Sequence, residues 1–407
     1  MTAPDPAQHA AEMPPEAELP FSRAEYERRL SAVKRAMVER ELDVLVVSEP
    51  SNLYYLTGYD AWSFYVVQAV IVGLEAPEPI WVGRAMDAPT ARMTTYLPED
   101  CVRPYPDTFV QSAARRPERF IAAVVRELQG ECGVIGVELG AHYYTARTHQ
   151  ELVKALPNAR FVDAELLVNW VRIRKSAAEL DYLREAGEIA ALAIERAGAS
   201  AAPGVRECDL VAEIYHKQMS GTEAFGGGYT STPPLLCCGP RALAPHAAWT
   251  DEPLRKGMPI NLELAGCRKR YHVPVSRSIY LGEPPSSYIG LADAVLDGLE
   301  ATLEAVRPGA TCEELELVWR NAVARHGIEK EARIGYSIGV AYPPTWGERT
   351  ASLRPGDATE LEPSMCFHLM TGLWREDAGI TITQSFAVTD RGHEPLTRLP
   401  RELIVKR

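Results

Sequence analysis

The sequence predicts a smaller α/β domain followed by a larger α+β domain in which helices cover a curved sheet. Short apolar runs alternate with helix-like segments up to about residue 165. Long helical segments come next, and the chain ends in segments that alternate like antiparallel strands. A length of 407 residues suits such a division. We expect a loose tail over residues 1–20, the first domain over 21–172 and the second over 173–407.

The first domain is expected to begin with a helix after Ser22, which is a favourable N-cap. Leu30, Val33 and Met37 then recur at helical spacing. Runs typical of buried strands lie at residues 43–47, 66–72, 79–82 and 134–137. Helix-like segments follow them at residues 117–128 and 145–156.

The second domain is expected to open with two long helices, and the first of these has one apolar face. These helices are expected at residues 176–197 and 207–218. Strand patterns follow at residues 235–237, 259–264, 276–281, 364–370 and 380–388. Two further helices are expected at residues 289–306 and 312–325.

The composition excludes several classes of function. A net charge of −12, from 43 basic and 55 acidic residues, disfavours nucleic acid as a partner. No apolar run approaches the ~18 residues of a membrane span. The start lacks a basic region followed by an apolar run, so we expect no export signal and a cytoplasmic location. The eight cysteines form no CxxC pair, which leaves a zinc knuckle unsupported.

Two residues stand out as candidates for chemistry. His246 follows an apolar strand on a loop stiffened by Pro240 and Pro245, which suits proton transfer. Backbone contacts that merely satisfy the ring remain the alternative. Glu263 interrupts an apolar strand, where a charge costs free energy unless it is paired. It therefore either faces solvent or meets a cation.

Two aromatic segments are candidate binding walls. Glycines and prolines over residues 333–348 predict a fixed loop that carries Tyr336, Trp346 and Glu348, although a purely structural loop remains open. Tyr59, Trp62 and Phe64 follow a turn-like Thr-Gly pair. Such rings belong either to a core or to a cage for a delocalised cation. The chain has no GxGxxG, P-loop, HExxH or GxSxG motif.

Taken in order, the motifs resemble the creatinase, prolidase and methionine aminopeptidase family. The matching segments are NLYYLTG at residues 52–58, RKS at 174–176, the His246 loop, the Glu263 strand, Arg277, and residues 335–339, 364–365 and 379–389. The resemblance implies a pita-bread C-terminal domain preceded by a creatinase-type N-terminal domain. It also implies a homodimer in which Tyr59, Trp62 and Phe64 complete the site of the second chain.

The resemblance places the family's five metal-ligand positions on Glu263, Pro274, Tyr336, Met370 and Thr383. Four of these five lack the carboxylate or imidazole that a divalent cation needs. We therefore expect no metal or other cofactor. The His246 position matches the proton-transferring histidine that the family's peptidases share with metal-free creatinase. The implied chemistry is metal-independent hydrolysis at an amidine-like carbon.

A narrower resemblance concerns LTGYDAWSFY, TPPLLCCGPRALAPHAAW and YPPTWGER, which look like the ectoine hydrolase branch. It implies opening of the cyclic amidine of ectoine to N-acetyl-2,4-diaminobutyrate. Glu263 then attacks the amidine carbon or holds the cation while water attacks, and His246 serves as general acid and base. Tyr336 is expected as a hydrogen-bond donor and Glu348 as a partner of an amidinium N–H. His368 faces either inward or outward.

Several points stay open at this level. The carboxylate of the substrate has Arg241 or Arg333 as a potential partner, and both also suit surface or structural roles. Turnover of 5-hydroxyectoine and a deacetylase partner acting on the product are further open points. Three rival functions remain: an amidinohydrolase of the creatinase type, an Xaa-Pro metallopeptidase with unusual ligands, and a non-catalytic protein-binding member.

Overall fold

The computed structural model describes residues 19–128, 132–164, 166–330 and 332–407. The chain divides into two compact units, one ending at Val171 and the other beginning at Arg172. The expected boundary lies one residue further on. Nearly all of the expected tail, residues 1–18, falls outside the described residues.

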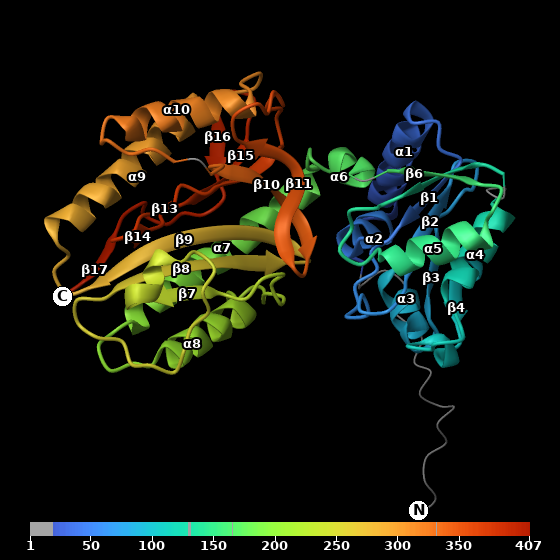
Figure 1. Cartoon of the computed structure of the whole chain (residues 1–407), viewed down its shortest axis with the longest axis horizontal. Helices are drawn as coiled ribbons and strands as arrows, with labels where there is room; N and C mark the ends of the chain where they lie inside the picture. The colour runs from blue at the N-terminus through green and yellow to red at the C-terminus, as the bar shows by residue number, and fades with distance from the viewer. Residues whose placement is uncertain (1–18, 129–131, 165, 331) are drawn as a thin grey trace, which may run out of the picture. The chain divides into compact units, whose positions relative to one another are not determined.

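The first unit is built on a mixed sheet with the strand order β4-β3-β2-β1-β5-β6 (Figure 1). The central strand β1 is antiparallel to β2 and parallel to β5. Its strands are β1 (Val44–Val47), β2 (Ala69–Gly73), β3 (Ile80–Arg84), β4 (Val102–Tyr105), β5 (Val134–Val137) and β6 (Arg160–Asp163). Its helices are α1 (Arg23–Glu39), α2 (Pro50–Thr57), α3 (Ala88–Thr94), α4 (Glu118–Glu127), α5 (Ala146–Ala155) and α6 (Leu167–Val171), with short 3₁₀ turns η2 (Ala85–Asp87), η3 (Glu99–Cys101) and η4 (Asp107–Phe109).

Local chemistry explains where the helices of this unit begin and end. The side chain of Ser22 accepts the Glu25 N–H at 3.3 Å, which confirms the expected N-cap of α1. The segment expected as a turn before Gly58 is instead the helix α2. Gly58 ends it at φ +88°, where a Cβ would press on the Thr94 carbonyl. The turn-like Thr57-Gly58 pair is thus the C-terminal end of a helix.

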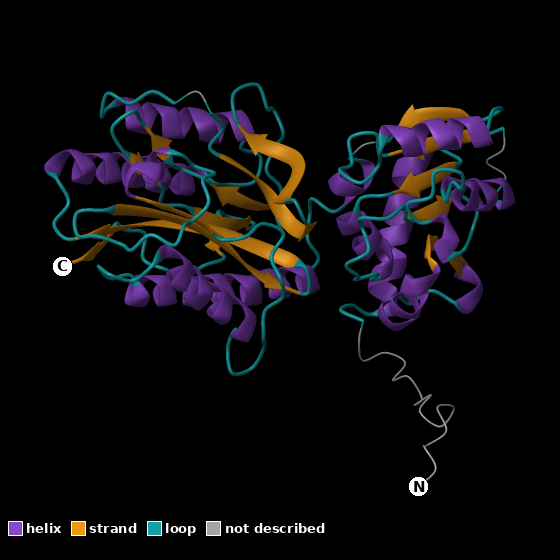
Figure 2. Ribbon diagram, turned by 60° about the horizontal axis from the view of Figure 1, so that its bottom comes forward, coloured by secondary structure: helices purple, strands orange, loops and turns teal. Residues whose placement is uncertain are grey.

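The second unit folds as a curved antiparallel sheet flanked by helices, as Figure 2 shows. The main path runs β16-β15-β12-β10-β9-β8-β7. The strands are β7 (Leu235–Cys238), β8 (Pro259–Arg268), β9 (Tyr271–Leu281), β10 (Gly335–Tyr342), β11 (Thr345–Leu353), β12 (Cys366–Leu369), β13 (Leu373–Trp374), β14 (Gly379–Ile380), β15 (Gln384–Val388), β16 (His393–Pro395) and β17 (Ile404–Lys406). The helices are α7 (Ala177–Ser200), α8 (Glu207–Ser220), α9 (Ser286–Ala305) and α10 (Cys312–Ala324), with the 3₁₀ turn η5 (Gly239–Leu243).

Each pair of helices covers its own half of this sheet (Figure 1). The α7 and α8 helices pack on β7, β8 and β9 through one apolar cluster. A second cluster joins α9 and α10 to β11, β12 and β15. The arrangement confirms the predicted fold class of both domains. Across the described ranges no helix combines the length and apolarity needed to cross a lipid bilayer.

The segment expected as a fixed loop at residues 335–348 is a β-hairpin, so that prediction was wrong. Strands β10 and β11 pair antiparallel, with Pro343 and Pro344 at the turn. The two glycines lie inside β10 because neighbours leave no room for a side chain. A Cβ at Gly335 would press on the His368 carbonyl, and one at Gly339 on the Glu348 carboxylate. Glycine in a strand thus marks close approach here.

Helix α7 supplies a matched test of packing on the sheet. A Cβ at Gly187 would overlap the Leu396 carbonyl, whereas one at Gly198 would make ordinary contact with Ile404. We predict that Gly187→Ala lowers the free energy of unfolding by about 1–3 kcal/mol because the helix must shift. Gly198→Ala should raise it by about 0.5–1 kcal/mol through helix propensity. Urea unfolding of both variants measures the contrast, and equal effects would contradict this packing.

Candidate active site

Glu263 is a partly exposed carboxylate in the middle of an otherwise buried strand. From Ile260 to Cys267 every other residue of β8 is buried. Desolvation raises the pKa of Glu263 to about 7. Within the described residues its carboxylate has no hydrogen-bond or ion-pair partner. An ionised carboxylate in such a place costs free energy unless it meets a cation.

The strand register fixes what surrounds this carboxylate. Glu263 lies opposite Leu235 of β7 and Ser276 of β9, so these three side chains share one face of the sheet. The Ser276 hydroxyl is buried and finds no hydrogen-bond partner in the described part of the chain. The face therefore carries polar groups that the protein itself leaves unsatisfied.

A buried chain of hydrogen bonds lies beside Glu263. The Trp346 indole N–H donates to the Tyr336 hydroxyl at 2.8 Å, and His368 Nδ1 lies 3.1 Å from the same oxygen. His368 Nε2 lies 2.9 Å from Thr383 Oγ1, which also accepts the Ser276 N–H at 2.7 Å. Of the two orientations left open for His368, the structure has the inward one.

Two proton arrangements fit these distances. If Thr383 donates to His368 Nε2, then Nδ1 donates to Tyr336, and the Tyr336 O–H is left available to a ligand. If Nε2 carries the proton, it donates to Thr383, and the Tyr336 O–H donates to Nδ1. Each arrangement leaves one hydroxyl proton without a partner among the described residues.

Burial shifts the pKa values of the side chains in this cluster and so decides which of them are charged. Burial lowers the pKa of His368 to about 3, so the imidazole is neutral at physiological pH. Burial, with a smaller contribution from the Glu263 charge, raises the pKa of Tyr336 above its usual range. Tyr336 therefore stays protonated, and Glu263 supplies the negative charge.

The family's metal positions do not fit a metal here. Pro274 and Met370 offer no hard side-chain donor, and Tyr336 and Thr383 are already hydrogen-bonded as neutral groups. In the described ranges no three His, Cys, Asp or Glu side chains gather as a metal-binding group. One carboxylate, Glu263, is too few for a divalent cation.

Glu348 is engaged elsewhere. Its carboxylate lies 2.6 Å from the Lys175 ammonium, and both side chains are 1% exposed. Lys175 also donates to the Ile173 carbonyl at 2.9 Å. The predicted contact of Glu348 with substrate would require it to share this ion pair. The pair ties β11 to the segment that leads into α7.

His246 lies on an exposed loop after η5, and no contact with the buried cluster is present among the described residues. The next residue nevertheless reaches back to the sheet, since the Cys237 thiol donates to the Ala247 carbonyl at 3.1 Å. Burial, and to a lesser degree the Glu263 charge, raises the pKa of Cys237. The His246 loop is thus attached on the face that bears Glu263.

The three aromatic residues of the first unit differ in exposure. Tyr59 is buried, and its hydroxyl lies 2.7 Å from Ser63 Oγ. Phe64 is also buried, with its ring 4.8 Å from that of Trp62. Trp62 is 59% exposed and is the one of the three that presents its ring to solvent. Tyr59 therefore has the core role that the sequence left open.

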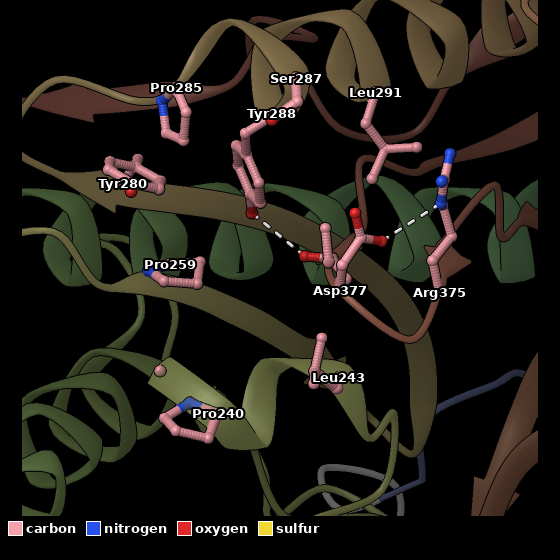
Figure 3. A pocket seen from close by; sticks show the side chains of 13 residues that line it. Pro240, Leu243, Pro259, Tyr280, Pro285, Ser287, Tyr288, Leu291, Arg375 and Asp377 are labelled. Atoms are coloured by element: carbon pink, nitrogen blue, oxygen red, sulfur yellow. Dashed lines mark hydrogen bonds and ion pairs between the residues drawn. The ribbon is translucent and has the colours of Figure 1, made fainter.

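A separate cavity of about 360 Å³ lies at the start of β8 (Figure 3). Arg375 faces Asp377 at its rim, at 3.3 Å. Asn261 lies between this cavity and Glu263 along the strand, and it donates to the Ala242 carbonyl at 2.9 Å. Neither Asn261 nor Glu263 is among the residues that line this cavity.

Sequence reasoning missed Ser276 and Cys237 as members of the site, and it placed Thr383 only as a lost ligand. The register Glu263 opposite Ser276 could have been found by counting along the two strands. The contact between Cys237 and Ala247 has no local signal.

The raised pKa of Glu263 predicts how stability changes with pH. Between about pH 4.5 and 7 the folded state binds a proton that the unfolded state has lost. Stability therefore falls as pH rises through this window, by up to about 3 kcal/mol. Glu263→Gln removes this titration, so the difference in unfolding free energy between the two proteins should change between pH 5 and 8. Chemical denaturation measures it, and a constant difference would contradict a desolvated Glu263.

Comparison with known proteins agrees with this architecture. The creatinase/prolidase N-terminal domain model matches residues 29–174, and the metallopeptidase family M24 model matches residues 181–390. A hydrolase/peptidase of Sinorhizobium fredii, itself uncharacterized, is 55% identical over 95% of this chain and 99% of its own. An ectoine hydrolase of Halomonas elongata is 45% identical over 95% of this chain and 99% of its own.

Solved structures show the same fold. A dipeptidase from Mycobacterium ulcerans matches with a TM-score of 0.78 at 24% identity, over 95% of this chain and 99% of that one. A prolidase from Thermococcus sibiricus reaches a TM-score of 0.80 at 18% identity, over 93% and 99%. With its N-terminal creatinase/prolidase domain and its pita-bread C-terminal domain, this chain belongs to metallopeptidase family M24.

Proposed function

We propose that this protein is a metal-independent hydrolase that opens the cyclic amidine of ectoine to N-acetyl-2,4-diaminobutyrate. The observation that carries the proposal is the lone, desolvated Glu263 carboxylate beside the neutral Tyr336 and His368 side chains. By the motif resemblance, Glu263 and Tyr336 stand at metal-ligand positions of the family's peptidases. The 45% identity to an ectoine hydrolase supports the choice of substrate. An amidinium ring supplies the positive charge that the site lacks.

Glu263 acts on the amidine carbon in one of two ways. Either its carboxylate adds to that carbon, or it holds the amidinium while water adds. In both routes the ring C–N bond breaks, the leaving nitrogen takes up a proton, and water supplies the acyl oxygen. The product is an open chain with one amide and one amine. A dry surrounding strengthens the attraction between Glu263 and the amidinium.

The neighbouring groups serve this reaction in different ways. The O–H of Tyr336 donates to the substrate in the arrangement where its oxygen accepts from both Trp346 and His368. His246 moves the proton between water and the leaving nitrogen when its loop lies over the site, and such a group contributes ~10²–10⁴-fold. Glu348 accepts a hydrogen bond from an amidinium N–H only if its carboxylate keeps the ion pair with Lys175 at the same time.

Several wider features belong to the same proposal. The protein works in the cytoplasm as a homodimer, in which Tyr59, Trp62 and Phe64 of one chain complete the site of the other. Because Tyr59 and Phe64 are buried, Trp62 is the ring best placed to touch a ligand. The substrate 5-hydroxyectoine suits the same carboxylate, and the acetylated product suits a deacetylase partner.

Replacement of Glu263 tests the proposal directly. We predict that Glu263→Gln lowers ectoine turnover by at least about 10³-fold, because the neutral amide neither attacks nor pairs with the amidinium. Chromatography of ectoine and its acetylated product measures this. Glu213→Gln on the exposed face of α8 is the matched control and should keep full activity.

Assays with different substrates, with and without a chelator, distinguish the proposed activity from that of a metallopeptidase or a creatinase-type amidinohydrolase. Ectoine turnover should survive dialysis against a chelator, whereas a metallopeptidase would lose its dipeptide cleavage. Creatine in the same assay identifies an amidinohydrolase of the creatinase type. Activity on dipeptides alone, abolished by chelator, would overturn the proposal.

The pH dependence of kcat/KM gives a further prediction. Glu263 must be ionised to act, and its pKa is about 7 in the ligand-free protein. We expect kcat/KM for ectoine to rise with pH along a limb with an apparent pKa near 7. A kcat/KM that stays flat from pH 5.5 to 8 would contradict Glu263 as the ionised group.

A further inference from the structure

The proposed site leaves one half of its substrate without a partner. Ectoine carries a carboxylate as well as an amidinium, and Glu263 and Tyr336 serve only the amidinium ring. The sequence left Arg241 and Arg333 as candidates for the carboxylate. The structure treats these two arginines differently.

Arg241 is already committed to the protein. Its guanidinium forms an ion pair with Glu207, which is almost fully buried at the start of α8. It also donates to Thr250 Oγ1 at 3.1 Å. Arg375, at the rim of the neighbouring cavity, is likewise paired with a protein carboxylate, that of Asp377. A substrate carboxylate at either arginine would compete with a protein carboxylate.

Arg333 is exposed and held in place by a ring rather than by a charge. Its guanidinium carbon lies 4.6 Å from the centre of the Tyr336 ring. Within the described residues the guanidinium has no hydrogen-bond or ion-pair partner. The next residue, Ile334, is buried and hydrogen-bonded to Leu353 on one side and Met370 on the other. These bonds fix the backbone directly after Arg333, at the point where β10 begins.

The charges of Arg333 and Glu263 act on the same phenol. Glu263 raises the pKa of Tyr336 and Arg333 lowers it, so both charges lie near that side chain. Arg333 also helps to lower the pKa of the buried His368. In the described structure Glu263 and Arg333 do not pair with each other. Tyr336 thus lies near a negative carboxylate on one strand and a positive guanidinium at the start of its own strand.

We infer that Arg333 binds the carboxylate of the substrate while Glu263 binds its amidinium, so that the site selects a zwitterion by its two ends. The inference rests on the proposed function. A planar guanidinium can stack on Tyr336 and still present an N–H edge to a carboxylate, which a lysine cannot do. Two parallel hydrogen bonds to the carboxylate would also orient the amidine carbon toward Glu263.

The test compares ectoine with 2-methyl-1,4,5,6-tetrahydropyrimidine, the same ring without the carboxylate. For Arg333→Ala we expect KM for ectoine to rise about 10–100-fold, the cost of one lost charge-assisted contact, with kcat within a few-fold of wild type. Arg333→Lys should recover part of the loss. The inhibition constant of the carboxylate-free ring should not change in either variant.

Arg196→Ala, which removes an exposed arginine on α7 paired with Glu213, is the matched control and should leave KM unchanged. The inference is overturned if Arg333→Ala has the KM of this control, or if it weakens the carboxylate-free ring as much as ectoine. Ectoine turnover by the wild-type protein tests the proposed function independently of the variants. Absence of ectoine turnover by wild type would overturn both.

Discussion

The structure of this site depends on one constraint, the desolvation of a single carboxylate in a fully paired sheet. At Glu263, strand β8 pairs with β7 on one side and with β9 on the other. Glu263 is thereby held among buried neighbours, and its pKa is raised to about 7. The groups beside it, Tyr336, His368 and Thr383, are neutral and bonded to one another. A cationic ligand is the natural complement of such a site.

The same constraint explains how a metallopeptidase scaffold accommodates different chemistry. By the motif resemblance, the family's five metal-ligand positions carry four neutral side chains and one carboxylate in this chain. In the proposed metal-free site, the loss of acidic ligands together with the cations keeps the buried charge low. The chain from Thr383 through His368 to Tyr336 joins three neutral side chains by hydrogen bonds. Positioning thus replaces Lewis acidity in the proposed reaction.

Much of the fold could be predicted because helices and buried strands leave local patterns. The capping residue Ser22, the apolar run of β1 and the long helix α7 were all located within a few residues. Two segments were wrong for the same reason. Gly58 and the glycines of β10 were interpreted as turn signals, whereas one ends a helix and the others lie where a strand is crowded. A glycine alone does not distinguish conformational need from lack of space.

The sequence by itself determined that one carboxylate interrupts an apolar strand, because residue identity and alternation are local facts. It also carried the motif resemblance from which four non-ligand residues are expected at the family's metal positions. Only the tertiary structure decided which groups meet: His368 with Tyr336, Glu348 with Lys175, and Arg241 with Glu207. It also left Arg333 stacked on Tyr336 with its N–H edge unused in the described structure. These partners lie between 3 and 173 residues apart along the chain. Their meeting depends on strand order and register, which a local pattern does not encode.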